Sequence, residues 1–169
     1  MKLKGILVST AFVIFAAVAV AQTGEEYVDK TGKFKLTLVG DWKAVNYDDA
    51  VGRRKAEFVY RDRSEGLLKI TRESLNGVSL ADLVRQEEQN LRTYRSGFES
   101  AASEAFGGGG LRGMRFAFYN TDGGRKAAGT YYYLEDGNSV WVLKFTGRRG
   151  SLDTIRNLTD QIARSFRPM

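Results

Sequence analysis

The sequence predicts an α+β domain in which a mainly antiparallel sheet of about six to eight strands packs with two long helices. Three observations predict this class. Residues 140–145 carry apolar side chains on both faces of one strand, as in a central strand that is covered on both sides. Asp136-Gly137, just before it, is typical of a hairpin turn, because glycine tolerates the positive φ that such turns need. The segment after it predicts an amphipathic helix, capped by Ser151, whose apolar stripe contains Leu152, Ile155, Leu158, Ile162 and Phe166.

Four strands are expected before the first helix. A short one at residues 27–28 lies in a polar lead-in, and residues 34–38 alternate apolar and polar side chains, as in a half-buried strand. Gly40-Asp41-Trp42 predicts a turn followed by a large aromatic residue, and residues 46–52 predict a loop. Residues 55–61 and 66–73 then alternate in the same way, so we expect them to pair as a hairpin.

The first long helix is expected between Ser79 and Gly97. Ser79 and Asp82 have the spacing of a capping box, and Gly97 suits the C-terminal end of a helix. The 3.6-residue period predicts that its buried stripe contains Leu80, Leu83, Val84, Leu91 and Tyr94.

Three more strands are expected after this helix and before the hairpin turn. A weak one covers residues 99–106, and stronger ones cover residues 111–120 and 126–135. Glycine-rich segments at 107–110 and 122–124 join them. Because tight turns connect most of the strands, the sheet is expected to be mainly antiparallel.

The first 21 residues have the three parts of a secretory signal peptide. Lys2 and Lys4 form a basic start, residues 6–20 an apolar run, and Ala19-Val20-Ala21 a small-residue cleavage site. Cleavage between Ala21 and Gln22 would leave residues 22–169 as a single domain in the periplasm or secreted. The alternative is a retained membrane anchor, but the apolar run is shorter than the roughly 20 residues that a spanning helix needs.

The composition restricts the chemistry, because the chain contains neither cysteine nor histidine. Disulfide frameworks, thiol catalysis, Ser-His-Asp triads and zinc sites with cysteine or histidine ligands are therefore excluded. Carboxylate, lysine, tyrosine and Ser-Lys chemistry remain. No catalytic, metal-binding or cofactor-binding residues are predicted, and we do not expect an enzyme.

Three groups of residues resemble functional sites, but a structural role is the better interpretation of each. The glycine run at 107–110 lacks the Lys-Ser/Thr and the following helix of a phosphate loop. Asp48-Asp49 lacks the spacing of a calcium loop and is interpreted as a solvated loop. The tyrosines at 131–133, beside Trp141, could stack on a ligand, but tyrosine is frequent in strands, so we assign them to the core and its rim.

Three local patterns resemble the PsbP-like superfamily, which includes DcrB-like exported bacterial proteins and a eukaryotic Ran-binding family. They are Gly32-x-Phe34-x-Leu36 leading to Asp41-Trp42, the strand segment at 137–147 (GNSVWVLKFTG), and the closing Ile162-x-x-Ser165-Phe166. The resemblance covers nearly all of the mature chain and implies a PsbP-like sandwich. Val39-Gly40 stands where the family usually has a proline before the tryptophan. These are core and turn positions, so the resemblance does not imply an activity. The exported bacterial members of the superfamily imply a small periplasmic protein.

The cations point to an anionic partner as one interpretation. After cleavage, 24 basic residues, 16 of them arginine, would face 20 acidic ones. Arg53-Arg54 and Arg148-Arg149 lie at element ends, and arginine suits carboxylate and phosphate partners. The four form one patch if both loops emerge at the same edge of the sheet; the alternative is local neutralisation by acids such as Asp48, Asp49, Glu57 or Asp153.

From these observations we expect an exported, non-enzymatic accessory or binding protein of the bacterial cell envelope. The alternative is a small periplasmic hydrolase that uses carboxylates. The expected partner is an envelope protein or an anionic surface, with no nucleic acid, no cofactor and no stable membrane insertion after cleavage.

Overall fold

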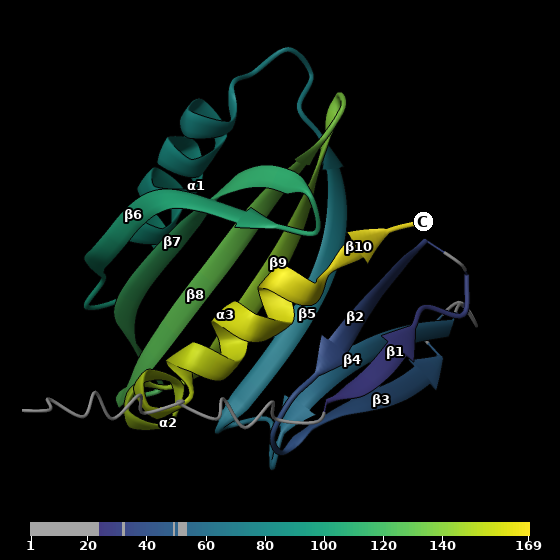
Figure 1. The fold of residues 1–169 in the computed structure, drawn as a ribbon. Helices are drawn as coiled ribbons and strands as arrows, with labels where there is room; N and C mark the ends of the chain where they lie inside the picture. The colour runs from purple at the N-terminus through teal and green to yellow at the C-terminus, as the bar shows by residue number, and fades with distance from the viewer. Residues whose placement is uncertain (1–23, 32, 49, 51–53) are drawn as a thin grey trace, which may run out of the picture.

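The computed structural model describes residues 24–31, 33–48, 50 and 54–169. A strongly curved seven-stranded antiparallel sheet forms its centre, with strand order β3-β4-β5-β9-β8-β7-β6 (Figure 1). A smaller antiparallel sheet has the order β1-β2-β10. The expected α+β class with a mainly antiparallel sheet is confirmed, and the division into two sheets is an addition to it.

The described elements are, in chain order, β1 (Glu25–Val28), β2 (Phe34–Leu38), β3 (Trp42–Asp48), β4 (Arg54–Tyr60), β5 (Gly66–Ser74), α1 (Leu80–Tyr94), β6 (Glu99–Gly108), β7 (Leu111–Asp122), β8 (Arg125–Asp136), β9 (Ser139–Arg148), α2 (Arg149–Thr154), α3 (Arg156–Ser165) and β10 (Arg167–Pro168).

The large sheet buries a core on each of its faces. Helix α1 covers one face, while α3 and the small sheet cover the other (Figure 1). Strand β9 is central, and its side chains alternate between the cores: Val140 and Val142 face α1, and Trp141, Leu143 and Phe145 face the other side. All five are nearly inaccessible to solvent, which confirms the prediction for this strand.

Helix α1 begins as expected. The Ser79 hydroxyl accepts a hydrogen bond from the Asp82 amide at 3.2 Å, so the capping prediction is confirmed. Tyr94 was wrongly placed in the buried stripe, because it is 82% exposed. Leu91 is the last buried residue of α1. The helix ends at Tyr94, and this last residue does not pack against the sheet.

Three other expectations need correction. The turn expected at Gly40-Asp41 is present, but residues 42–48 form strand β3, where a loop was expected from residue 46. This edge strand is mostly exposed, so it lacks a strong apolar alternation. The last helix is divided at Ile155 into α2 and α3, and Ser151 lies inside α2 instead of capping it. The apolar stripe continues across the break and therefore does not reveal it. Finally, β10 pairs with β2 beyond α3.

Candidate functional site

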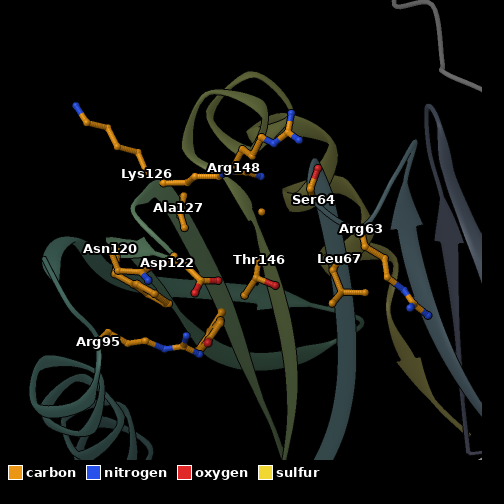
Figure 2. A pocket seen from close by; sticks show the side chains of 16 residues that line it. Arg63, Ser64, Leu67, Arg95, Asn120, Asp122, Lys126, Ala127, Thr146 and Arg148 are labelled. Atoms are coloured by element: carbon orange, nitrogen blue, oxygen red, sulfur yellow. The ribbon is translucent and has the colours of Figure 1, made fainter.

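A cavity of about 520 Å³ opens on the α1 side of the large sheet (Figure 2). Its walls come from the β4–β5 turn, the β7–β8 turn, the end of β9 and the end of α1. Antiparallel pairing gathers these segments, because β4, β7 and β9 run toward this end of the sheet and β5 and β8 start from it. The volume lies within the range of small-molecule sites, roughly 300–1,000 Å³.

Positive charge dominates the lining. Among the described residues, Asp122 is the one carboxylate that lines the cavity, against five cationic side chains: Arg63, Arg95, Arg125, Lys126 and Arg148. Arg63 is neutralised by an ion pair of 2.9 Å with Glu57 of β4. Arg95, Arg125 and Lys126 interact with no carboxylate that the structure describes, and Arg148 interacts electrostatically with Asp62 of the β4–β5 turn without forming an ion pair. A concave surface with unpaired charges of one sign concentrates the field and attracts ions of the opposite sign.

Arg95 reaches into the cavity from the C-terminal end of α1. Its backbone is extended, with φ −108° and ψ 119°, and its amide donates to the carbonyl of Leu91. The next residue fixes the exit of the chain, since the Ser96 carbonyl accepts a 2.7 Å hydrogen bond from the Thr121 amide of β7. In Figure 2 the Arg95 side chain extends toward the strands that carry Asp122 and Thr146, whereas Lys126 points away from the centre.

The floor between the cations is partly apolar. Leu67 of β5 and the rings of Phe118 and Tyr131 contribute to it. These two rings meet edge to face at 85°, with their centroids 5.1 Å apart, and both are buried. The site therefore combines a cationic rim with an apolar surface that could cover part of an organic molecule.

Several polar groups of the lining have no side-chain hydrogen bond within the described part of the chain. They are the amide of Asn120 and the hydroxyls of Tyr131 and Thr146. Burial, followed by the charge of Glu87, raises the pKa of Tyr131 to about 12, while the charge of Arg95 opposes this shift. The Tyr131 hydroxyl therefore keeps its proton at neutral pH and can donate a hydrogen bond. Together with Arg95, these groups can act as donors to an anion.

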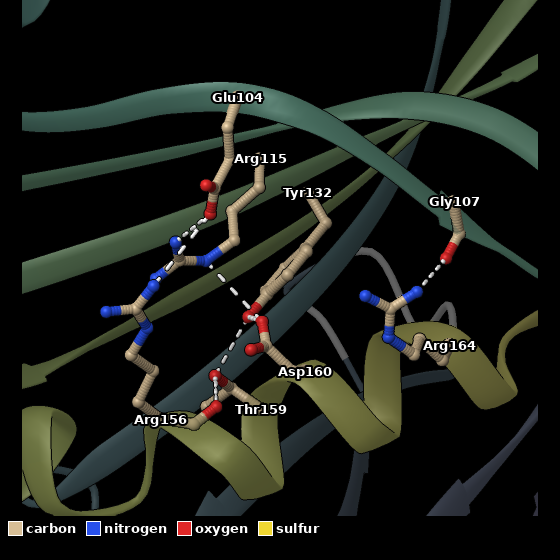
Figure 3. A network of polar contacts seen from close by, with 8 residues as sticks. All are labelled: Glu104, Gly107, Arg115, Tyr132, Arg156, Thr159, Asp160 and Arg164. Atoms are coloured by element: carbon tan, nitrogen blue, oxygen red, sulfur yellow. Dashed lines mark hydrogen bonds and ion pairs between the residues drawn. The ribbon is translucent and has the colours of Figure 1, made fainter.

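A second polar cluster lies on the opposite face, between the sheet and α3 (Figure 3). The buried guanidinium of Arg115 donates to Glu104 at 2.5 Å and lies 3.5 Å from Asp160. The Tyr132 hydroxyl donates to Asp160 at 2.6 Å and shares a hydrogen bond with Thr159. Because its charges are paired internally, this cluster fastens α3 to the sheet. A cavity of about 140 Å³ lies beside it.

Carboxylates are sparse in both cavities. Asp122 lines the larger one and Asp153 the smaller one. Within the described residues, no group of three or more acidic side chains is arranged to hold a metal ion. The larger cavity therefore provides cations and hydrogen-bond donors rather than a pair of acids.

The fold can be compared with that of known proteins. No protein-family model matches the sequence, and no curated protein matches it. The solution structure of cyanobacterial PsbP (CyanoP) from Synechocystis is similar, with a TM-score of 0.63 and 13% identity over 90% of this chain and 96% of that one. LpqN of Mycobacterium tuberculosis, described as involved in cell envelope biogenesis, matches with a TM-score of 0.60 and 12% identity, over 86% of this chain and 85% of that one. The Ran-binding protein Mog1p of Saccharomyces cerevisiae matches with a TM-score of 0.59 and 9% identity, over 86% and 95%.

The chain has the Mog1/PsbP-like fold. This confirms, at the level of the fold, the resemblance to PsbP-like proteins that the sequence patterns indicated. At these identities the similarity carries no residue roles, so the basic cavity of this Mog1/PsbP-like domain stands on its own geometry.

The Mog1/PsbP-like fold separates the predicted site residues. Arg148, the last residue of β9, lines the cavity. Arg149 begins α2, and its guanidinium lies 3.7 Å from the ring centroid of Tyr119, which packs with the core on the other face. Both therefore lie on regular elements instead of the expected loop.

The other predicted pair lies elsewhere. Arg53 is outside the described residues, and Arg54 begins β4. Strand β4 ends at Tyr60, at the same end of the sheet as Arg148. Arg54 lies six residues before Tyr60, so about 20 Å of strand separates it from that end of the sheet. A single patch requires both arginine pairs to lie at the same edge of the sheet. Arg54 and Arg148 do not lie at the same edge.

Sequence reasoning missed the other cations of the cavity, Arg63, Arg95, Arg125 and Lys126. Arg63 lies in the β4–β5 turn, Arg95 follows α1, and Arg125 and Lys126 begin β8 directly after a turn, so all four lie next to element ends. Gathering them requires the order and direction of the strands, which the alternation patterns did not provide. A search for cations next to turns at one end of an antiparallel sheet could have found them.

Proposed function

We propose that this chain is an exported, non-enzymatic accessory or binding protein of the bacterial cell envelope, and that it binds an anionic partner at the basic cavity. The observation that carries the proposal is the lining of this cavity, where three cations, Arg95, Arg125 and Lys126, have no carboxylate partner among the described residues. The partner is an anionic surface or the acidic group of another envelope component.

The export part of the proposal rests on the N-terminal sequence. Its basic start, apolar run and small-residue cleavage site are typical of a signal peptide. In the part of the chain that the structure describes, no helix is long and apolar enough to cross a membrane. The similarity in fold to LpqN, described as involved in cell envelope biogenesis, supports the same location.

The alternative, a hydrolase that uses carboxylates, receives less support. Glycoside hydrolysis requires two carboxyl groups on opposite sides of the scissile bond, roughly 5–10 Å apart. Asp122 stands in the larger cavity among cations, with no second carboxylate in the described lining. Binding is therefore the better account of this site.

We expect the mature protein to begin at Gln22. A small-x-small sequence ending at Ala21 directs cleavage after that residue. Intact-mass measurement of protein recovered from the envelope fraction tests this. A full-length species that is extracted only by detergent would show that the apolar run is retained as an anchor.

We also expect the mature chain to sediment with vesicles that contain phosphatidylglycerol, and to lose this binding at high salt. Exposed charges are screened over a Debye length of about 8 Å at physiological ionic strength. Each cation near an anionic surface contributes about 1 kcal/mol, so an Arg95→Gln, Arg148→Gln double variant should bind roughly 30-fold more weakly.

Arg149→Gln is the matched control for this experiment. It removes the same charge one residue away from Arg148 but outside the cavity, so it should retain more of the binding than Arg148→Gln. Equal partitioning to neutral and anionic vesicles would contradict the anionic partner. Equal losses in Arg148→Gln and Arg149→Gln would show that net charge, rather than the cavity, determines binding.

A further inference from the structure

The basic cavity contains two kinds of surface, and together they restrict its ligand. A flat anionic surface could contact the cations of the rim, but it could not reach the recessed floor, where Phe118, Asn120 and Tyr131 are all less than a tenth exposed. An inorganic anion could use the donors but would leave the apolar floor uncovered. The volume of about 520 Å³ exceeds what a single inorganic anion would fill.

We infer that the cavity binds an organic anion, with an acidic head held by Arg95 and its neighbouring donors and an apolar body covering Leu67, Phe118 and Tyr131. This inference rests on the proposed function and specifies its ligand. The acidic head is a phosphate monoester or a carboxylate, since the planar guanidinium group suits both. The molecule is either a soluble metabolite or the headgroup region of a lipid, which share this chemistry.

The head is assigned to Arg95 because several donors gather near it. Asn120, Tyr131 and Thr146 line the same cavity and make no side-chain hydrogen bond with another described residue. Their polar atoms are not among the buried unpartnered ones of the described residues, so they are accessible from the cavity and can donate to a ligand with several acceptor oxygens. Arg95 and Tyr131 line the same cavity, and the Arg95 side chain extends into it from the end of α1 (Figure 2).

Asp122 offers a test in which the inference predicts stronger, not weaker, binding of the anion. It is the one carboxylate in the described lining, and Figure 2 shows it on the same side of the cavity as Asn120. Its charge opposes an acidic head. Asp122→Asn should therefore tighten binding several-fold, whereas a change that merely damaged the fold would weaken it.

The experiment is calorimetric titration of the mature protein with three probes: phenyl phosphate, inorganic phosphate and benzyl alcohol. We expect phenyl phosphate to bind about tenfold more tightly than inorganic phosphate, because the ring covers apolar surface. Benzyl alcohol, which lacks the charge, should bind more weakly than either. Arg95→Gln should weaken both anions, and Leu67→Ala only phenyl phosphate. Arg85→Gln is the control, since this exposed α1 residue pairs with Asp82 away from the cavity.

The outcomes separate this inference from the proposed function. Equal affinities for phenyl phosphate and inorganic phosphate would overturn the organic ligand and leave anion binding intact. Binding to anionic vesicles without binding of either soluble anion would also overturn it, in favour of contact with a surface. Failure of both vesicles and soluble anions would overturn the proposed function itself. If phenyl phosphate binds and displaces the chain from vesicles, the lipid headgroup occupies this cavity; if it binds without displacement, the ligand is a soluble anion.

Discussion

Trp141→Ala should reduce the free energy of unfolding by about 3–5 kcal/mol, as large-to-small changes of buried aromatic residues do. Trp141 is 3% exposed and joins the layers of the domain. Its indole packs against Phe34 of β2 and Phe166 at the end of α3, with ring centroids 5.7 and 5.2 Å apart. Its Nε1 donates to Asp136 at 3.0 Å. Urea denaturation followed by circular dichroism measures the loss.

Tyr94→Ala is the matched control for this variant. Tyr94 is also a large aromatic residue, but it is 82% exposed at the end of α1, so its removal should change stability by less than about 0.5 kcal/mol. A loss below about 1 kcal/mol in Trp141→Ala would contradict the role of β9 as the strand that joins the two cores. A loss of several kcal/mol in Tyr94→Ala would contradict the position of the end of α1.

The sequence predicted best those parts of the fold whose signal is local. The apolar run of β9, the hairpin turn at Asp136-Gly137 and the Ser79 cap of α1 each depend on neighbouring residues, and all are present. The tyrosines at 131–133 also alternate as expected: Tyr132 lies in the core on the α3 side, and Tyr131 and Tyr133 lie in the core beneath α1.

The features that the sequence could not provide are those that depend on distant segments. Strand β3 exists because its backbone pairs with β4 along its whole length, although few of its side chains are buried. Strand β10 pairs with β2, which lies about 130 residues earlier. The cavity has the same origin, since Arg95 and Arg148 meet only through the order of strands in the sheet. Arg148 was selected because it belongs to an arginine pair, and its position at the cavity follows from the length and direction of β9.

Stability should fall steeply above pH 10, because three adjacent tyrosines are buried. Burial is the largest cause that raises the pKa of Tyr131, to about 12, and it also raises the pKa of Tyr132 and Tyr133. Below about pH 10, tyrosine is protonated in both the folded and the unfolded chain, so its contribution to stability is fully present. Above that pH the unfolded chain loses these protons while the folded chain retains them, so stability is lost as the pH rises toward the folded pKa values.

The expected loss is about 1.4 kcal/mol per pH unit for each tyrosine, or about 4 kcal/mol per unit for the three, between roughly pH 11 and 12. Since domains of this kind have a total stability of about 5–15 kcal/mol, the chain should unfold within this range or close to it. Urea denaturation at a series of pH values measures the slope. Tyrosinate absorbance from the three residues should appear together with the loss of the circular dichroism signal.

Tyr133→Phe separates the effect of the tyrosines on alkaline unfolding from that of other groups that titrate at high pH, such as lysine side chains. The Tyr133 hydroxyl is buried and has no hydrogen-bond partner in the described part of the chain. Removing it should therefore leave stability at neutral pH unchanged or increase it by about 1–3 kcal/mol, because an unsatisfied buried hydroxyl is costly. The same variant should lower the alkaline slope by about a third, since one of three ionisable groups is gone. If the slope is unchanged in Tyr133→Phe, or if the buried tyrosines ionise near pH 10 while the chain stays folded, burial does not control their ionisation.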